Sequence, residues 1–317
     1  MKKLVVLVLA LLALSAAAAF AEFPEKQITV VCPYAAGGAS DTTSRIYASM
    51  LQKAAGVPVI VDNRTGSNGT VGMTYSAQAA PDGYTVAYMP VESVINKFEG
   101  IGDVTTENFK FLGLAMTIPA AITVRADSEW NSFADFLEYA KKNPGDITVG
   151  NSGTGSIWHI AAAAVEDVCG VELEHIPYPA GASAAIAGLL GGEIDAVAVS
   201  GAEVSTYVAD GQLKTLVILG SNRCSAESLA NVPTATELGY NVSVEGWGGF
   251  AVPASTDGAI VAKLVELSNS AINSTEMVDL LASKGYEHTY KDGAAADAYA
   301  KGQLEYYGKL VPTLKLN

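Results

Sequence analysis

The sequence predicts an α/β fold with mainly parallel sheets flanked by helices, in a chain long enough for two domains. The first observation is that apolar, β-branched runs alternate with helical runs through short loops from residue 28 onward. The second is a corner in which a strand leads through a glycine turn into a helix, at Gly37–Gly38 and again at Gly153–Gly155. The third is length, because residues 22–317 can build two cores of ordinary size.

The first part of the chain has a strand, helix, strand, helix, strand order, which is typical of a parallel sheet. The expected elements are strands at 28–33, 57–61 and 84–89 and helices at 42–55 and 71–79. Pro33 cannot donate to a ladder, so the first strand ends there or lies at an edge. Ser40 or Asp41 is expected to cap the first helix, and Gly56 to end it.

The second part repeats this order after two apolar runs within 109–124 and an amphipathic helix at 132–142. The expected strands are 147–150, 173–178, 194–199, 213–219 and 246–252, and the expected helices are 157–168 and 182–190. From residue 260 to the end we expect helices, with a break at 285–293.

The first 21 residues are typical of a secretory signal peptide. Lys2 and Lys3 precede an apolar run that ends in Ala19-Phe20-Ala21, a cleavage pattern. Cleavage after Ala21 would leave a protein that begins at Glu22, without a cysteine to accept lipid, and we expect it free in the periplasm of a Gram-negative bacterium. Loss of both lysines takes the formal net charge from −14 to −16, which argues against nucleic acid and anionic membranes as partners.

Cofactor and metal motifs are not found. The glycines from Gly150 to Gly155 miss the dinucleotide pattern, because Trp158 stands where its third glycine would be, and no phosphate-loop GKS or GKT occurs. No Cys/His spacing resembles a metal site. Cys32, Cys169 and Cys224 permit at most one disulfide within the chain, and the sequence does not fix the pair.

The two glycine corners predict a site for a small anion. Free N–H groups and the positive end of the helix dipole suit a carboxylate or phosphate. The corners contain no Lys or Arg, so an anion there would depend on backbone N–H groups, hydroxyls and bridging water. Tyr34, Trp158 and Tyr178 lie at or beside the corners, where they are expected either to wall a pocket or to form core between domains.

A hydrolase is the alternative from another class. Ser156 and His159 share one face of a helix start, but no G-x-S-x-G elbow and no evident carboxylate partner accompany them. His159 is instead expected to donate a hydrogen bond within the corner or to a neighbouring loop. Asp41 is explained as a cap, and His175 and His288 as structural or exposed residues.

Seven stretches in order resemble the receptors of tripartite tricarboxylate transporters, also called the Bug family of periplasmic binding proteins. They are ITVVCPYAAGGASDTTSR from residue 28, VIVDNRTGSNGTVG from 59, APDGYTVAY from 80, GNSGTGSIWHIAAA from 150, IPYPAGASAAIAGLLGGEIDA from 176, NVPTATELGY from 231 and WGGFAVPAST from 247. The chain departs from the family at Tyr34-Ala35-Ala36 and at Tyr178-Pro179-Ala180-Gly181. Both differences touch the expected pocket, so the resemblance does not specify the substrate.

The resemblance implies a two-lobed periplasmic binding protein of type II, with 22–122 and 249–317 in one lobe and 123–248 in the other. Two hinge strands would cross near 120–124 and 250–252. A ligand carboxylate would lie between 34–41 and 151–156, and the far end of the ligand near Ser93 and Ser200. The expected ligand-binding residues are Tyr34, Ala36, Gly37, Gly38, Ser40, Asp41, Asn151, Gly153, Thr154, Gly155, Ser156, His159, Tyr178, Gly181, Ala182 and Ser200.

The implied function is capture of a small mono-, di- or tricarboxylate and its delivery to a membrane permease. We expect no catalysis, no cofactor, no metal and a monomer. A receptor that presents its ligand to a sensor kinase is the alternative within binding proteins, and genetic neighbourhood would discriminate the two.

Overall fold

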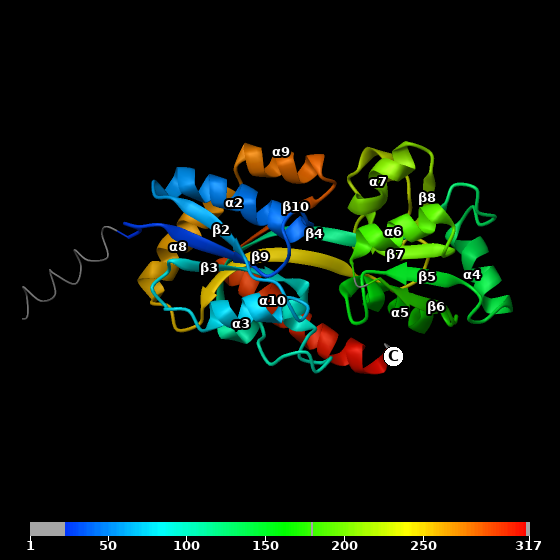
Figure 1. Cartoon of the computed structure of the whole chain (residues 1–317), viewed down its shortest axis with the longest axis horizontal. Coiled ribbons are helices and arrows are strands. Elements are labelled where there is room, and N and C mark those ends of the chain that lie inside the picture. Colours follow the sequence, from blue (N-terminus) through cyan, green and yellow to red (C-terminus); the bar gives the residue numbers. More distant parts are fainter. Residues whose placement is uncertain (1–22, 179, 315–317) are drawn as a thin grey trace, which may run out of the picture.

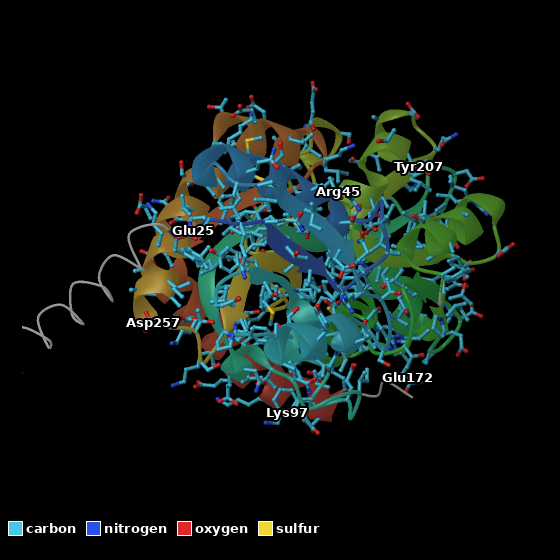
Figure 2. The ribbon with its side chains drawn as sticks, turned by 60° about the vertical axis from the view of Figure 1, so that its left-hand side comes forward. Glu25, Arg45, Lys97, Glu172, Tyr207 and Asp257 are labelled. Carbon is cyan, nitrogen blue, oxygen red and sulfur yellow. The ribbon has the colours of Figure 1, made fainter. Side chains whose placement is uncertain are left out.

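A computed structural model describes residues 23–178 and 180–314, and the expected signal peptide lies outside them. Two groups of helices and strands lie end to end, joined by the long strands β4 (Phe109–Arg125) and β9 (Glu245–Pro253), as Figure 1 shows. Charged side chains such as Glu25, Lys97, Glu172 and Asp257 project from the periphery (Figure 2). No helix in the described part is long and apolar enough to cross a membrane.

The first sheet has the strand order β2-β1-β3-β9-β4, and β10 pairs with β4. Its strands are β1 (Ile28–Cys32), β2 (Val59–Asn63), β3 (Thr85–Pro90) and β10 (Glu287–Asp292), with β9 and one part of β4. The β1 strand is parallel to both neighbours, with Val30 opposite Val61 on one side and Val86 on the other. Only β9 and β10 run against the other strands of this sheet, which confirms the mainly parallel order.

The helices of this end are α2 (Ala39–Ala55), α3 (Thr70–Ala77), α8 (Gly258–Ile272), α9 (Thr275–Ser283) and α10 (Gly293–Leu310). The α2 helix packs on α8 through Tyr47, whose hydroxyl shares a 2.6 Å hydrogen bond with Ser268. The Tyr47 ring stacks on Phe250 of β9, with ring centroids 3.5 Å apart. This contact fixes α2 against the sheet.

The second sheet has the strand order β4-β7-β5-β6, and β8 also pairs with β4. Its strands are β5 (Thr148–Asn151), β6 (Glu174–Pro177), β7 (Ala196–Ser200) and β8 (Leu213–Leu219), which all run against β4. The helices are α4 (Phe133–Lys142), α5 (Ile157–Cys169), α6 (Ala182–Gly191) and α7 (Gly201–Ala209).

The two apolar runs within 109–124 form one strand that belongs to both sheets. Up to Pro119 the β4 strand pairs with β9, and from Ala120 onward it pairs with β7 and β8. Pro119 lacks an N–H, which suits the point where the partner changes. The chain returns from the second sheet to the first just before β9. The Val244 N–H still donates to Leu219 of β8, whereas Glu245 already pairs with Pro119 as part of β9. Residues 250–252, where the second crossing was expected, pair with β3 and β4 inside the first sheet.

Two elements were not predicted. The α7 helix follows β7 directly, and a capping box of Ser200 and Glu203 starts it. The β10 strand lies in the expected break and pairs antiparallel with β4 along a half-buried edge. Its residues alternate too weakly between apolar and polar to show a strand from sequence.

Neither Ser40 nor Asp41 caps α2, as the sequence had suggested. The N-cap is Gly38, and no side chain accepts a hydrogen bond there. The Asp41 carboxylate instead accepts the Gly37 N–H at 2.9 Å and pairs with Arg45 at 2.8 Å. Burial opposes ionisation of Asp41, but these contacts and Asn63 hold its pKa below the usual range. Cys32, Cys169 and Cys224 are buried and free, so the permitted disulfide does not form in the structure.

The start of α5 is capped by its own first turn. Ser156 accepts the His159 backbone N–H at 3.2 Å, and the His159 Nδ1 atom accepts the Gly155 N–H at 3.1 Å. The sequence predicted that His159 donates a hydrogen bond in this corner. For the Nδ1 atom this is wrong, because Nδ1 accepts a hydrogen bond and therefore carries no proton. Burial, and secondly His175, lowers the pKa of His159 to about 4.

This arrangement predicts a loss of stability in acid. A histidine with a folded pKa of about 4 takes up a proton more readily when unfolded, so its contribution is lost as pH falls from 6.5 towards 4. The variant His159→Asn keeps an acceptor for the Gly155 N–H but does not titrate. We expect the difference in unfolding free energy between pH 7 and pH 4.5, measured with urea, to shrink by about 2 kcal/mol in the variant. Equal differences in both proteins would contradict the assignment.

Candidate functional site

A cavity of about 1090 Å³ lies where the two sheets meet and is lined from both sides. The first side contributes residues 33–40 and 65–69 together with Tyr88 and 90–92, and the second contributes residues from the starts of α5, α6 and α7. Met116 and Ile118 of β4 and Gly246 and Trp247 of β9 lie between them. We call this cavity the cleft.

Four helices begin at the cleft, because each follows a strand whose carboxyl end reaches the same edge. Their N-caps are Gly38 for α2, Ser156 for α5, Gly181 for α6 and Ser200 for α7. Ser156 and Ser200 satisfy N–H groups of their own helices, whereas no side chain caps α2 or α6. Two positive helix ends with open first-turn N–H groups therefore line one cavity.

The structure brings most of the predicted ligand-binding residues to the cleft. The lining includes Tyr34, Ala36, Gly37, Gly38, Ser40, Gly153, Thr154, Ser156, Gly181, Ala182 and Ser200. These residues come from three separate glycine corners and from the end of β7. The corners at Gly37–Gly38 and at 153–156 thus lie on the same cavity, as the repeated motif had suggested.

Five of the predicted residues do not line the cleft, and each has another local role. Asp41 holds Gly37 and Arg45. The side-chain oxygen of the fully buried Asn151 accepts the Gly153 N–H at 2.9 Å and so stabilises the glycine turn. The Tyr178 ring lies against Gly150 and Gly188, where a side chain would collide with it. Gly155 and His159 belong to the second glycine corner, but they lie outside the lining of the cleft.

Gly155 contacts Glu99 of the other side of the cleft. Its φ of +73° suits glycine, and a Cβ atom there would collide with the Glu99 carboxylate. Both Glu99 carboxylate oxygens are buried and have no hydrogen-bond partner within the described residues. Burial, and secondly the nearby Glu92, raises the pKa of Glu99 to about 7. Glycine at position 155 therefore allows Glu99 to pack against the second side.

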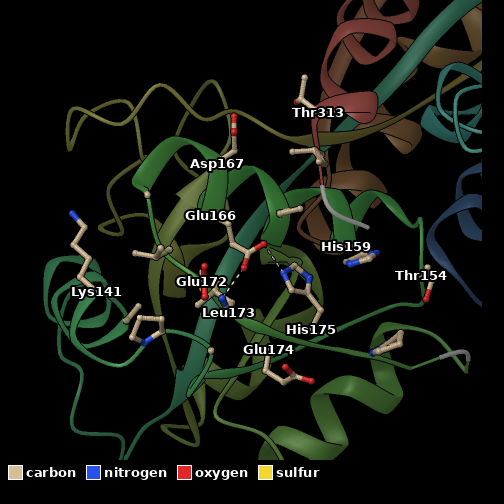
Figure 3. A pocket seen from close by; sticks show the side chains of 18 residues that line it. Lys141, Thr154, His159, Glu166, Asp167, Glu172, Leu173, Glu174, His175 and Thr313 are labelled. Atoms are coloured by element: carbon tan, nitrogen blue, oxygen red, sulfur yellow. Dashed lines mark hydrogen bonds and ion pairs between the residues drawn. The ribbon is translucent and has the colours of Figure 1, made fainter. Parts of the chain in front are cut away.

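His159 lines a second cavity, of about 970 Å³, on the outer side of α5 (Figure 3). The His175 Nε2 atom lies 2.9 Å from a carboxylate oxygen of Glu166 there, and the His159 and His175 rings are 4.8 Å apart. Ser156 accepts a backbone N–H from His159 and the imidazole accepts one from Gly155, so the pair does not form the hydrogen bond between nucleophile and base that a hydrolase requires.

Several residues of the cleft were missed from sequence. The loop 65–69 was assigned only to a helix start, although it follows β2 at the same edge of the sheet as the first corner. Ser93 was expected near the far end of the ligand, but it is buried and donates to the Pro90 carbonyl oxygen, and its neighbour Glu92 lines the cavity. Tyr88, Met116, Ile118 and Trp247 were not assigned to the ligand, and Glu203 was missed although it forms a local capping box with Ser200.

The charge of the lining is acidic. Among the described residues that line the cleft there is no Lys, Arg or His, and the carboxylates are Glu92 and Glu203. The Glu92 carboxyl group lies beside the Tyr34 hydroxyl and Ile157, while Ser200 donates to Glu203. Burial raises the pKa of both Glu92 and Glu203. No group of metal-ligating side chains occurs in the described part of the chain.

Comparison with known proteins gives consistent matches over nearly the whole chain. The family model described as "Tripartite tricarboxylate transporter family receptor" matches residues 43–316. A UPF0065 protein from the gbd 5′ region of Cupriavidus necator is 31% identical over 298 residues, which cover 93% of this chain and 89% of that protein. BugT of Bordetella pertussis is 28% identical over 268 residues, covering 83% of this chain and 81% of BugT.

Solved structures share the fold. A TctC solute-binding protein from Polaromonas has a TM-score of 0.80 at 37% identity, covering 92% of this chain and all of that chain. The periplasmic binding protein BugD has a TM-score of 0.78 at 28% identity, covering 92% of this chain and 98% of its own. Both are solute-binding proteins, and the fold that they share with this chain confirms the predicted fold class. The chain belongs to the tripartite tricarboxylate transporter receptor family.

Proposed function

We propose that this chain is a periplasmic receptor that binds a small organic acid in the cleft and delivers it to a membrane transporter. The observation that carries the proposal is the pair of uncapped helix starts, at Gly38 and Gly181, on one cavity. A carboxylate placed there would satisfy N–H groups that no side chain of the protein satisfies. The family description, which names a transporter receptor, supports delivery as the purpose of binding.

The remaining donors of the cleft suit a carboxylate without a cationic side chain. Ser40, Thr154 and Ser183 supply hydroxyl groups along the lining. Trp247 is 2% exposed, and its indole N–H has no acceptor within the described residues. Each helix end contributes roughly 0.3 to 1 kcal/mol towards an anion at an exposed site and more when partly buried. Several such weak contacts together can bind one carboxylate.

Closure of two lobes around the ligand follows from this arrangement. We propose lobes of about 23–119 with 245–314, and 120–244, a few residues from the bounds that the sequence resemblance implied, with bending where the chain passes between the sheets, near Pro119–Ala120 and Val244–Glu245. A ligand held by α2 from one side and by α6 from the other gains its second contact only in the closed state. Binding energy would then favour closure.

The rest of the proposal concerns the cell and the partners. The mature protein would begin at Glu22 after removal of the signal peptide, act as a monomer and dock on the permease subunits of its transporter. It would bind its ligand without turnover, which the arrangement of Ser156 and His159 supports. Presentation of the ligand to a sensor kinase is the second candidate, because the same closure would serve it.

The first prediction concerns the class of ligand. A thermal-shift screen of the purified mature protein against small organic acids, followed by calorimetry, should find a carboxylate with micromolar or tighter affinity. At a concentration about 100-fold above Kd, stabilisation of about 2.7 kcal/mol should raise the melting temperature by about 5 °C or more. The uncharged amide of the same compound should have no effect. Binding of neutral solutes alone, with every acid inert, would contradict the proposal.

The second prediction concerns the open start of α2. The Gly38 backbone has φ −80° and ψ 177°, which an aspartate N-cap adopts readily, and a Cβ atom there meets only the Ala35 carbonyl oxygen at 3.9 Å. In Gly38→Asp the new carboxylate should occupy the N–H groups that the ligand uses. We expect affinity for the ligand to fall at least about tenfold, while the unliganded protein gains roughly 0.3 to 1 kcal/mol of stability.

The matched control is Gly38→Ala, which adds a methyl group but no carboxylate and should keep affinity within about threefold. Calorimetry measures affinity, and urea unfolding of the unliganded proteins measures stability. Unchanged affinity in Gly38→Asp would place the ligand elsewhere in the cleft. Gly155 is unsuitable for this test, because a side chain there would collide with Glu99 and separate the two sides.

A further inference from the structure

The cleft combines carboxylates and aromatic rings without any cationic side chain. Glu92 and Glu203 line it together with Tyr34, Tyr88 and Trp158, and no Lys, Arg or His does so among the described residues. The open helix starts can hold one carboxylate through backbone N–H groups, but no positive side chain in the lining offsets the two glutamates. Carboxylates beside aromatic faces are instead the usual surroundings of an ammonium group.

Glu92 brings a carboxyl group into the lining of the cleft. It lies in the short helix η1 (Val91–Val94) directly after β3, on the first side of the cleft. Its carboxyl group is buried and lies beside the Tyr34 hydroxyl on the same side and beside Ile157, the first residue of α5, on the opposite side. A carboxyl group of the protein itself therefore lies at the start of α5.

Glu203 has the same role at α7. Its carboxylate oxygen accepts the Ser200 hydroxyl at 2.6 Å and the Ser200 backbone N–H at 3.2 Å, which completes a capping box. The starts of α5 and α7 thus each have a glutamate beside them, whereas the starts of α2 and α6 remain open. The cleft has a place for one anionic group and, beside it, acidic groups that would repel a second anion.

We propose that the ligand is a small zwitterion with one carboxylate and one ammonium group, an inference that rests on the proposed function. The carboxylate binds at the open starts of α2 and α6. The primary or quaternary ammonium group lies by Glu92 and the aromatic rings that line the same cavity. Glu92 is then the residue that determines specificity, since it attracts the ammonium group and disfavours a dicarboxylate of equal length.

The test compares ligands that differ only in the second group. Calorimetry on the mature protein at pH 7.5 would measure Kd for succinate against 4-aminobutyrate, glutarate against 5-aminovalerate, and adipate against 6-aminohexanoate, with trimethylated forms of the three amino acids. We expect at least one aminocarboxylate or its trimethylated form to bind tenfold or more tightly than its dicarboxylate partner.

Two variants assign the effect to the cleft. In Glu92→Gln the shape is kept and the charge removed, so the aminocarboxylate should lose at least tenfold in affinity while the dicarboxylate gains. Glu203→Gln keeps the capping box, because glutamine serves at that position, and should shift the same ratio by a smaller factor. The matched control is Glu174→Gln, an exposed glutamate that lines only the second cavity (Figure 3) and should leave the ratio unchanged.

The outcomes separate this inference from the proposed function. Tighter binding of dicarboxylates by the wild-type protein, with the same ratio in Glu92→Gln, would overturn the zwitterion and leave the carboxylate receptor intact. Failure of every dicarboxylate and every aminocarboxylate, with binding of an uncharged solute, would overturn both. Circular dichroism and the melting temperature of each unliganded variant check that a loss of affinity is not a loss of fold.

Discussion

The rest of the site depends on the backbone N–H groups at the helix starts that face the cleft. Parallel strands end at one edge of each sheet, so the helices that follow them begin at that edge and direct their positive ends into the same space. Buried N–H groups without acceptors are costly, and the chain satisfies only some of them. Ser156 and Ser200 close their own helices, while Gly38 and Gly181 leave theirs open.

Negative charge is distributed so that only short-range contacts can hold an anion. The chain carries a formal charge of −14, and the described lining of the cleft adds glutamates and no cation. The overall field therefore repels an anionic ligand, and the attraction comes from dipoles within a few ångströms. Such a site discriminates by geometry and local charge. Exchange of a single buried carboxylate for an amide can consequently change which ligand it prefers.

Local features of the site could be predicted from the sequence. A strand, a glycine turn and a helix start are close along the chain, so the corners at Gly37–Gly38 and Gly153–Gly155 were identified correctly, and the fold class followed from the order of such units. The capping box at Ser200 and Glu203 is also local, and attention to it would have predicted α7.

The roles of single residues within the corners could not be predicted, because they depend on partners distant in sequence. Gly155 looks like a ligand contact until Glu99 is placed against it, and Glu92 has no visible role until the fold brings it beside Ile157 at the start of α5. His159 was assigned to the ligand because its neighbours in sequence line the cleft, but the helix turns its ring to the outer side of α5. Only tertiary structure determines which helix start keeps its N–H groups free.

The contacts between the two sides also bear on the proposed opening of the cleft. Glu92 lies beside the first residue of α5, Glu99 lies against Gly155, and the Trp158 ring lies against Gly246 of β9, so all three contacts involve the start of α5. Opening would expose Glu99 to water, where its pKa would return from about 7 towards 4.5. The closed form therefore binds more protons between these values, and a fall in pH from 7 towards 4.5 favours closure. His159 lies wholly within the second side, so its titration affects the stability of that side, whereas the opening equilibrium depends on the carboxyl groups between the two sides, Glu92 and Glu99.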